Sequence, residues 1–412
     1  MNDHARFPSA SASTALTHAR DDVRALVASR IREVANAGMG DPDILAFWFG
    51  EPDEVTPDFI RDEAVRSLAA GETFYNPNFG IPELREEIAA YVARLHGDAD
   101  QISPSRIAVT ASGMSALMLA VQALVGGGDR VVCVTPLWPN LTEIPRVLGA
   151  EVVRAPLDFG RRGWTLDTDC LLAALTPGTR AVMINSPNNP TGWTIDRDSQ
   201  RAILAHCRRH GIWIVADDVY ERLHYAGPGC APSFLDIASA DDRLVSTNSF
   251  SKSWLMTGWR LGWIVAPEPL MMDLGKLIEY NTSCSPVFVQ RAGVVALRDG
   301  EPTVAHTFER YAKARDYLVG ALCALPGVET AAPDGAMYVF FRVTGVDDSL
   351  DFCKRLVRDA RLGLAPGSAF GPEGEGFVRW CFAASEERLA EGVRRLRAFL
   401  DGTHPSRDAA RA

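Results

Sequence analysis

A regular alternation of short apolar runs and helix-length segments between residues 107 and 266 constrains the fold more than any other feature of this chain. Each run has the length of a strand and is mostly apolar, which is typical of sheets buried on both faces. Parallel neighbours in such sheets need connections of helical length. The alternation therefore predicts an α/β fold in which helices sandwich a mostly parallel, seven-stranded sheet. The strands are predicted at 107–110, 130–135, 151–154, 181–185, 213–217, 244–247 and 263–266.

The pattern loosens after Gly262, where we predict a second, smaller α+β unit. A helical region over 271–315 is followed by strand-like segments at 337–343 and 376–382 and by a terminal helix at 385–400. The Ser/Ala-rich start of the chain leaves a transit peptide open, but we favour a flexible arm. The predicted organisation is an arm at 1–20, a segment at 21–50 that contributes to the small unit, a large unit at 51–290, the small unit at 291–403 and a tail at 404–412.

The composition argues against several classes of function. The net charge is −10 and no long basic block occurs, so we expect no nucleic-acid partner. No apolar run reaches the length of about 18 residues that a membrane span needs. The eight cysteines include no Cys-x-x-Cys pair and the eight histidines lack metal-binding spacing. We therefore expect reduced thiols, no metal and a cytoplasmic location.

A polar stretch between two predicted strands, 249–262, carries the residues with the clearest chemistry. Lys252 lies there beside hydroxyls and a second cation, which should lower the preference of its amine for the protonated form. Only a neutral amine attacks an aldehyde, so such a lysine suits covalent catalysis. Ser249, Ser251 and Arg260 supply hydroxyls and a guanidinium suited to a phosphate dianion. The alternative is a basic surface loop.

Other candidate residues follow predicted strands, at the edge where open parallel sheets bind ligands. Asp217 ends one strand, with Tyr220 just beyond, and could either hold a positively charged ring or cap a helix. Asn189 lies in an Asn/Pro-rich turn, and turns of this composition need no ligand. Trp138 also follows a strand, although a lone tryptophan is more often core.

Ser112-Gly113-Met114 begins a predicted helix, whose first backbone N–H groups attract phosphate. The segment 113–117 partly resembles the nucleophile elbow of a serine hydrolase, but the second glycine of that motif is missing. Arg379 lies within a predicted apolar strand. Because a buried guanidinium needs an anion, either a structural salt bridge or an anionic ligand is expected there.

Ser-x-Ser-Lys at 249–252, followed by Met-Thr-Gly-Trp-Arg-x-Gly-Trp at 256–263, resembles the lysine region of the class I/II aminotransferases of fold-type I, which depend on pyridoxal phosphate. Asn-Pro-Thr-Gly at 189–192 is a second specific feature of that family. The resemblance extends roughly from Trp48 to Phe382, with the motifs in the expected order. It implies that the large unit binds pyridoxal phosphate.

The resemblance assigns Lys252 to the internal aldimine with the cofactor. It places the cofactor phosphate on backbone N–H groups, hydroxyls and a guanidinium, from Ser112, Gly113, Met114, Ser249, Ser251 and Arg260. Many members have a hydroxyl or a charged residue near Met114, so the chain departs from the pattern there. The phosphate site is therefore expected to depend more on backbone N–H groups.

The cofactor ring would contact four residues in this resemblance. Asp217 would pair with the pyridine nitrogen, Trp138 would stack on the ring, and the phenolic oxygen would meet Tyr220 and Asn189. The catalytic residues would then be Lys252, Asp217 and Tyr220.

The substrate and a second subunit would meet the remaining predicted residues. The substrate would be bound by Gly50, Asn189 and Arg379, with Arg379 on the α-carboxylate. Tyr75, in the segment 75–86, would reach the cofactor phosphate of the neighbouring subunit. A homodimer is the expected assembly.

The function that the resemblance implies is transfer of an amino group from an L-amino acid to a 2-oxo acid by a ping-pong mechanism. A lyase acting on C–S bonds or by β-elimination would share the cofactor residues and remains the alternative. A non-catalytic regulator domain is disfavoured, because no basic helix pair precedes Gly50. We expect a broad or non-acidic amino donor, because no second carboxylate-binding cation can be assigned. Four aromatic residues could line the pocket or belong to the core: Trp48, Phe49, Tyr338 and Trp380.

Overall fold

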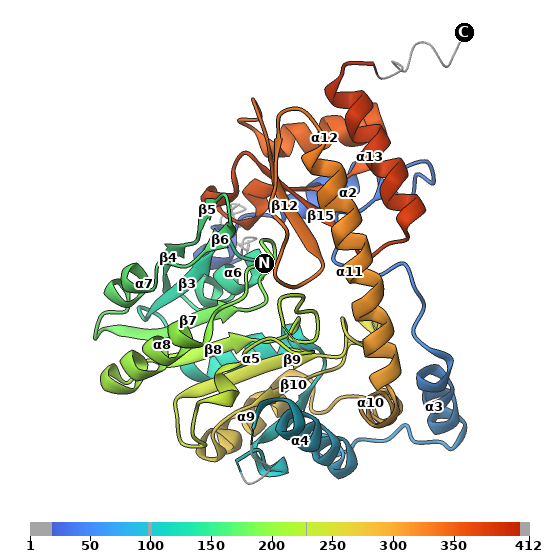
Figure 1. The fold of residues 1–412 in the computed structure, drawn as a ribbon. Coiled ribbons are helices and arrows are strands. Elements are labelled where there is room, and N and C mark those ends of the chain that lie inside the picture. Colours follow the sequence, from blue (N-terminus) through green and yellow to red (C-terminus); the bar gives the residue numbers. More distant parts are fainter. Residues whose placement is uncertain (1–18, 98–100, 228, 404–412) are drawn as a thin grey trace, which may run out of the picture.

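The computed structural model describes residues 19–97, 101–227 and 229–403. Its largest sheet has seven strands in the order β2-β10-β9-β8-β7-β3-β4. Neighbouring strands are parallel except at β10, which runs antiparallel to both β2 and β9. The predicted α/β fold with a mostly parallel seven-stranded sheet is confirmed (Figure 1). The strands are β2 (Ile107–Thr110), β3 (Arg130–Thr135), β4 (Glu151–Pro156), β7 (Thr179–Asn185), β8 (Trp213–Asp217), β9 (Leu244–Ser249) and β10 (Gly262–Val265).

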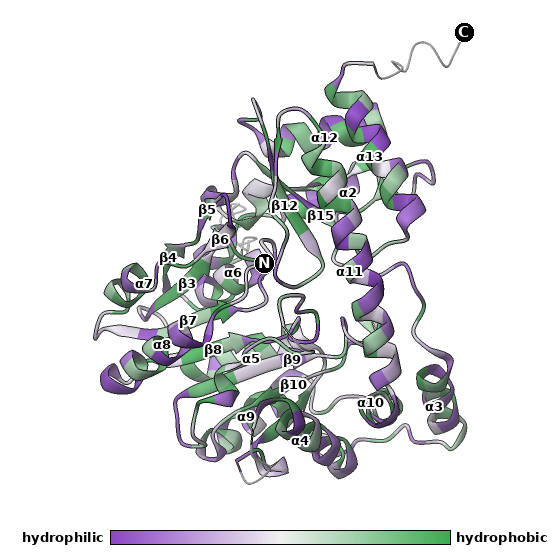
Figure 2. Ribbon diagram, in the orientation of Figure 1, coloured by the Kyte–Doolittle hydropathy of each residue, from purple (hydrophilic) through white to green (hydrophobic). Residues whose placement is uncertain are grey.

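Each central strand contributes side chains to two hydrophobic layers, because successive residues of a strand point to opposite faces. In β3, Val131 and Cys133 belong to one layer, whereas Val132 and Val134 belong to the other. The first layer is closed by α5 (Gly113–Leu124), α6 (Pro139–Val147) and α9 (Glu268–Asn281). The second is closed by α4 (Pro82–His96), α7 (Thr168–Ala174), α8 (Arg197–His210) and α10 (Val287–Asp299). Burial on both faces explains why the central strands β3, β7 and β8 are mostly apolar, as Figure 2 shows.

A second sheet of four strands, in the order β11-β12-β15-β14, lies above the first in Figure 1. The long helix α11 (Glu301–Cys323) runs from the large sheet to the small one, which α12 (Ser349–Ala360) and α13 (Glu386–Leu400) cover. The N-terminal segment joins this part of the molecule, because β1 (Leu45–Ala46) pairs with β13 (Leu362–Gly363). The strands of the small sheet are β11 (Val328–Glu329), β12 (Tyr338–Val343), β14 (Ala365–Pro366) and β15 (Phe377–Cys381).

The predicted division into an arm, two units and a tail stays a prediction, and residues 1–18 and 404–412 lie outside the described residues. The helical region predicted over 271–315 consists of three helices, α9, α10 and α11. α9 ends before Ser283, whose φ is +58°, and Pro286 directly precedes α10. The remaining elements are α1 (Asp21–Arg24), α2 (Arg30–Asn36), α3 (Asp58–Ala69), β5 (Asp158–Gly160), β6 (Gly163–Thr165), η2 (Pro104–Arg106), η3 (Phe234–Asp236), η4 (Thr257–Trp259), η5 (Gly367–Phe370) and η6 (Pro372–Gly374).

Among the described residues, no helix combines the length and the apolarity needed to cross a bilayer.

Gly262, the first residue of β10, lies against backbone on two sides. A Cβ atom at this position would be 2.5 Å from the Gly113 nitrogen and 2.7 Å from the Asn248 carbonyl oxygen. Because backbone cannot move aside cheaply, Gly262→Ala should lower the free energy of unfolding by about 1–3 kcal/mol in urea titrations. Gly258→Ala is the matched control, since nothing lies within 4 Å of a Cβ atom there. Equal stability of the two variants would contradict the prediction.

Candidate active site

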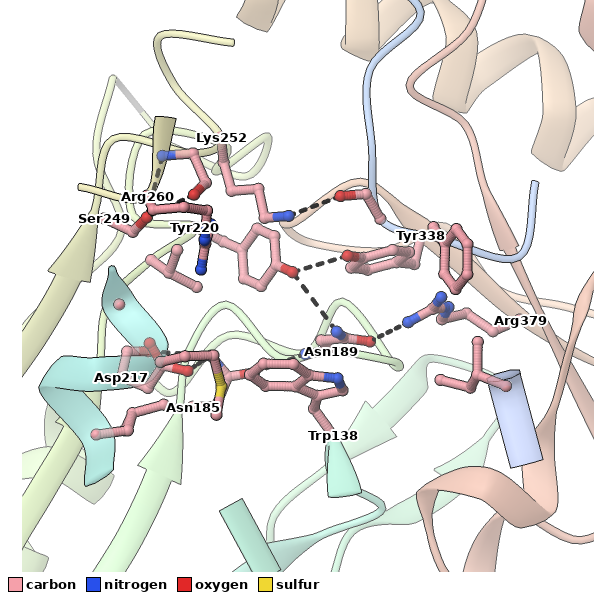
Figure 3. A pocket seen from close by; sticks show the side chains of 18 residues that line it. Trp138, Asn185, Asn189, Asp217, Tyr220, Ser249, Lys252, Arg260, Tyr338 and Arg379 are labelled. Atoms are coloured by element: carbon pink, nitrogen blue, oxygen red, sulfur yellow. Dashed lines mark hydrogen bonds between the residues drawn. The ribbon is translucent and has the colours of Figure 1, made fainter. Parts of the chain in front are cut away.

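One pocket collects almost all the residues that the sequence analysis singled out (Figure 3). It has a volume of about 270 Å³ and is lined by residues from the ends of β7, β8 and β9 together with residues of β12 and β15. Two predicted residues, Ser112 and Tyr75, do not line it. The predicted residues that do are Gly50, Gly113, Met114, Trp138, Asn189, Asp217, Tyr220, Ser249, Ser251, Lys252, Arg260 and Arg379.

Lys252 lies in the turn that follows β9 and points its amine across the pocket. Its Nζ donates to the Gly50 carbonyl oxygen at 2.6 Å and lies 5.9 Å from the centre of the Tyr220 ring. Burial, assisted by the neighbouring Arg379 and Arg260 guanidinium groups, lowers the pKa of the Lys252 amine to about 8. The sequence analysis expected this direction but attributed it to the cation and hydroxyls; burial is the larger cause. A large fraction of the amine is therefore neutral in mildly alkaline solution.

Asp217 is the last residue of β8, opposite Asn185 at the end of β7. The Asn185 amide donates to the Asp217 carboxylate at 3.2 Å and to its backbone carbonyl at 3.0 Å. Burial, reinforced by the charge of Asp218, raises the pKa of the Asp217 carboxyl to about 7. Residues 218–223 form no helix, so Asp217 is not a helix cap. A positively charged group in the pocket would favour the ionised carboxylate.

Four polar side chains form a chain of hydrogen bonds along one wall of the pocket (Figure 3). The Tyr220 and Tyr338 hydroxyls are 2.7 Å apart, and the Asn189 amide donates to the Tyr220 hydroxyl at 3.5 Å. Arg379 Nη1 donates to the Asn189 side-chain oxygen at 2.9 Å. Burial, with Tyr338 as a neighbour, raises the pKa of Tyr220 well above its usual value, so this phenol stays protonated.

Arg379 is 2% exposed in the middle of β15. Its guanidinium donates to Asn189 and to the Trp48 carbonyl oxygen, but its Nε atom has no hydrogen-bond partner among the described residues. Within those residues Arg379 also forms no ion pair, so the structural salt bridge considered from the sequence is not found there. A buried guanidinium facing a pocket without a counter-charge is suited to bind an anionic ligand.

The opposite end of the pocket combines a helix start with hydroxyls and a cation. Gly113 is the first residue of α5, and a Cβ atom there would approach Ser249 Cβ to 3.0 Å. The Ser249 hydroxyl donates to Ser251 Oγ at 2.8 Å, and Arg260 lines the same end. Ser112 lies just outside the lining, where its Oγ accepts from the Ser115 backbone at 3.0 Å and caps α5. This arrangement offers N–H groups, hydroxyls and positive charge to one anion.

Close packing or a hydrogen bond positions three further predicted residues. A Cβ atom on Gly50 would lie 1.9 Å from the Tyr338 hydroxyl, so only glycine leaves room for that side chain. Trp138 lines the pocket, and its backbone N–H donates to the Asn189 carbonyl oxygen at 2.9 Å. Met114 also faces the pocket and accepts a hydrogen bond from Asn140 at its sulfur, at 3.4 Å.

Sequence reasoning missed several lining residues. Asn185 could have been found, because it ends a predicted strand next to the one that ends at Asp217. Ile31, Leu117 and Val219 carry no sequence signal that separates them from core residues; all line the pocket. Of the four aromatic residues left open, Phe49 and Tyr338 line the pocket, whereas Trp48 and Trp380 are buried in the core.

Tyr75 lies away from the pocket and is 91% exposed. The exposed apolar side chains Val55, Phe59, Val65, Leu68 and Phe74 come from the same part of the chain, in and around α3. A group of exposed apolar side chains around an exposed tyrosine is typical of an interaction surface.

Comparison with known proteins agrees with this geometry. Residues 42–396 match the family of class I and II aminotransferases. The chain belongs to this family. It is therefore an aminotransferase enzyme, of a family that depends on pyridoxal phosphate.

Similar proteins match along almost their whole length. An aspartate aminotransferase of Pyrococcus horikoshii is 36% identical, over 91% of this chain and 95% of that protein. An aromatic-amino-acid aminotransferase of Thermococcus litoralis is 33% identical, over 90% of this chain and 95% of that protein. The solved structure of a Thermus thermophilus aspartate aminotransferase variant superposes with a TM-score of 0.85 at 31% identity, covering 92% of this chain and 99% of that one.

The lowered pKa of Lys252 predicts an unusual pH dependence of its reactivity. In cofactor-free protein, reductive methylation of Lys252 should reach half of its maximal rate near pH 8, because only the neutral amine reacts. An ordinary lysine amine would do so near pH ~10.4. Mass spectrometry of the peptide that contains Lys252 measures the rate, with Nα-acetyl-lysine in the same tube as reference. Coinciding midpoints for the two amines would contradict the prediction.

Proposed function

We propose that this aminotransferase holds pyridoxal phosphate in the described pocket through Lys252 and uses non-acidic amino acids as donors. The single observation that carries the proposal is the placing of a buried amine with lowered pKa between two anion-binding ends of one pocket. One end is built by Arg260, Ser249 and the start of α5, and the other by Arg379. Two separated anion sites suit a phosphate-bearing cofactor and a carboxylate-bearing substrate.

The donors at the pocket fit the cofactor at both ends. A Cβ atom on Gly113 would crowd Ser249, so glycine at this position keeps the first N–H groups of α5, including that of Met114, open to a phosphate. Ser112 supports this end by capping the helix, while Ser251 adds a hydroxyl. The unpartnered Nε atom of Arg379 is the donor that a carboxylate would satisfy.

The side chains would divide the chemistry as follows. Bound pyridoxal phosphate supplies an aldehyde that links covalently to amines and a ring that withdraws electrons from the substrate Cα. Asp217 would keep the ring nitrogen protonated, and this contact restores the ionised form of its own carboxyl. Asn189 and Tyr220 would orient the phenolic oxygen, and Trp138 would cover one face of the ring.

Lys252 would play two roles in the reaction. It would hold the cofactor covalently through its amine, and the same amine, when free, would act as the base and acid that moves the proton of the substrate Cα. A pKa of about 8 suits both directions of this proton transfer near neutral pH. Arg379 and Gly50 would hold the substrate carboxylate and backbone so that the Cα–H bond faces the amine.

The donor preference follows from the charges that line the pocket. Its cations are Lys252, Arg260 and Arg379, and each already has a role in the scheme above. Ile31 and Phe49 supply apolar lining. An acidic side chain would therefore be desolvated without a partner, which is costly. We also propose a cytoplasmic location, on the strength of the eight free cysteines.

A panel of amino donors with a 2-oxo acid acceptor tests the function. Phenylalanine and leucine should give a kcat/KM at least about tenfold above that of aspartate, and each reaction should form a new amino acid. Ammonia and pyruvate in place of a new amino acid would support the lyase. Preference for aspartate would reject the donor assignment and point to Arg32, which lies 4.7 Å from the Phe49 ring centre. Lys252→Ala is the control: it should form no product and carry no borohydride-trapped cofactor.

We further propose that the enzyme is a homodimer in which Tyr75 reaches the phosphate end of the neighbouring site. Its exposure beside other apolar side chains supports this arrangement, because such a surface is costly to leave in water. The site of one subunit would then be complete only with a second copy.

Hybrid dimers test the shared site. Tyr75→Ala and Lys252→Ala chains, each nearly inactive alone, should regain a substantial fraction of activity when co-expressed and purified as hybrids. One site of each hybrid then combines an intact Lys252 with the intact Tyr75 of the other chain. Activity of the mixture no higher than that of the separate variants would exclude the arrangement, as would a monomer in sedimentation velocity. A Tyr280→Ala chain, altered at another exposed tyrosine, serves as control and should need no complementation.

A further inference from the structure

A second group of reactive side chains lies outside the pocket, where the end of α4 meets the segment that follows β8. His96, Glu221 and Cys230 bring a ring nitrogen, a carboxylate oxygen and a sulfur within 4.8 Å of one another. His96 Nε2 is 2.8 Å from Glu221 Oε2 and 3.5 Å from Cys230 Sγ. None of the three lines the pocket around Lys252, so the amino-transfer site does not account for them.

The surroundings of the group match those of a metal-binding imidazole. The second nitrogen of His96, Nδ1, lies 2.8 Å from Asp236 Oδ1, and Asp236 is itself held by Arg197 and by the Ser233 backbone. The Tyr91 hydroxyl donates to Glu221 Oε1 at 3.3 Å and leaves Oε2 directed at the ring. Metal-bound imidazoles usually have such a carboxylate behind them, and metal-bound carboxylates a hydrogen-bond donor.

The backbone fixes the three side chains without help from an ion. Glu221 and Cys230 are held near each other, because the Ala231 N–H donates to the Glu221 carbonyl oxygen at 2.7 Å. The residues next to them are also joined, because Arg222 Nε donates to the Gly229 carbonyl oxygen at 3.0 Å. His96 and Glu221 are buried, and Cys230 is partly buried. Little ordering would therefore be needed on binding, which favours affinity.

The charges of the group suit a divalent cation. Both nitrogens of His96 face carboxylate oxygens, Nδ1 that of Asp236 and Nε2 that of Glu221, each at 2.8 Å. Replacing the Nε2 proton and the thiol proton by one divalent ion leaves the net charge of the group unchanged. The exchange therefore adds no unbalanced charge to a buried place.

We propose that His96 Nε2, Glu221 Oε2 and Cys230 Sγ bind one Zn²⁺ ion. Nitrogen, oxygen and sulfur donors together are the ligand set of zinc, and three protein ligands leave a fourth tetrahedral position for water. Binding releases the Nε2 and thiol protons to solvent and involves no change of oxidation state. The ion would link the end of α4 to Glu221, which directly follows the pocket residue Tyr220. It would therefore help to hold the Tyr220 side of the active site in place.

Metal analysis of the cofactor-loaded enzyme tests the proposal. Protein equilibrated with Zn²⁺ and then dialysed against a weak chelator should retain one zinc per chain by plasma mass spectrometry. X-ray absorption at the zinc edge should show one sulfur at about 2.3 Å and nitrogen or oxygen neighbours at about 2.0–2.2 Å. Retention of no zinc, or a metal shell without sulfur, would overturn the proposal.

Matched variants locate the ion. Cys230→Ser should lose the sulfur neighbour and most of the zinc, and Asp236→Asn should weaken binding about 10–100-fold. Cys323→Ser, at an exposed cysteine, and His210→Ala, in a histidine pair with ring centres 4.5 Å apart, should retain the metal. Zinc retained in Cys230→Ser or lost in His210→Ala would overturn the assignment. Circular dichroism establishes that each variant is folded, and none of these readouts depends on amino transfer.

Discussion

The buried guanidinium of Arg379 holds three distant parts of the chain at one point. It belongs to β15 of the small sheet, and it donates to Asn189 after β7 and to the Trp48 carbonyl oxygen in the N-terminal segment. Lys252, after β9, makes a similar contact with the Gly50 carbonyl oxygen two residues further on. Because a buried cation is stabilised by the acceptors that it contacts, these hydrogen bonds hold the N-terminal segment between the two sheets. The walls of the pocket are thus positioned by the same groups that would bind its ligands.

Burial acts on the acids and bases of the pocket in opposite directions. It lowers the pKa of Lys252 to about 8 and raises that of Asp217 to about 7, so both groups move toward their neutral forms. A ligand that carries a protonated ring nitrogen and a phosphate would reverse the cost at Asp217 and offset that of Arg260. Such a ligand would pair with buried charged groups that only the folded chain brings together. Because it would bind the folded state alone, it should stabilise the folded chain.

Much of this site can be predicted from the sequence because its polar residues lie at the ends of strands. Apolar runs mark the strands, and a polar residue that closes a run, such as Asp217, lies at the carboxyl edge of a parallel sheet. The contributions of Ile31 and Tyr338 depend on how the N-terminal segment and the second sheet pack on the first, which periodicity does not encode. The grouping of His96 with Cys230 is equally hidden, because spacing rules detect metal ligands on one local element and these residues come from separate ones.

The reversed direction of β10 keeps the lysine turn compact. A parallel strand after β9 would begin at the far edge of the sheet, and its first residues could not face the pocket. The antiparallel return lets Arg260, just before β10, lie at the same edge as Ser249 and Lys252. The connection between β9 and β10 thus places an amine, two hydroxyls and a guanidinium at one end of the pocket. Its length is consequently under tight constraint: residues inserted between 252 and 260 would separate the amine from the cation without disturbing either strand.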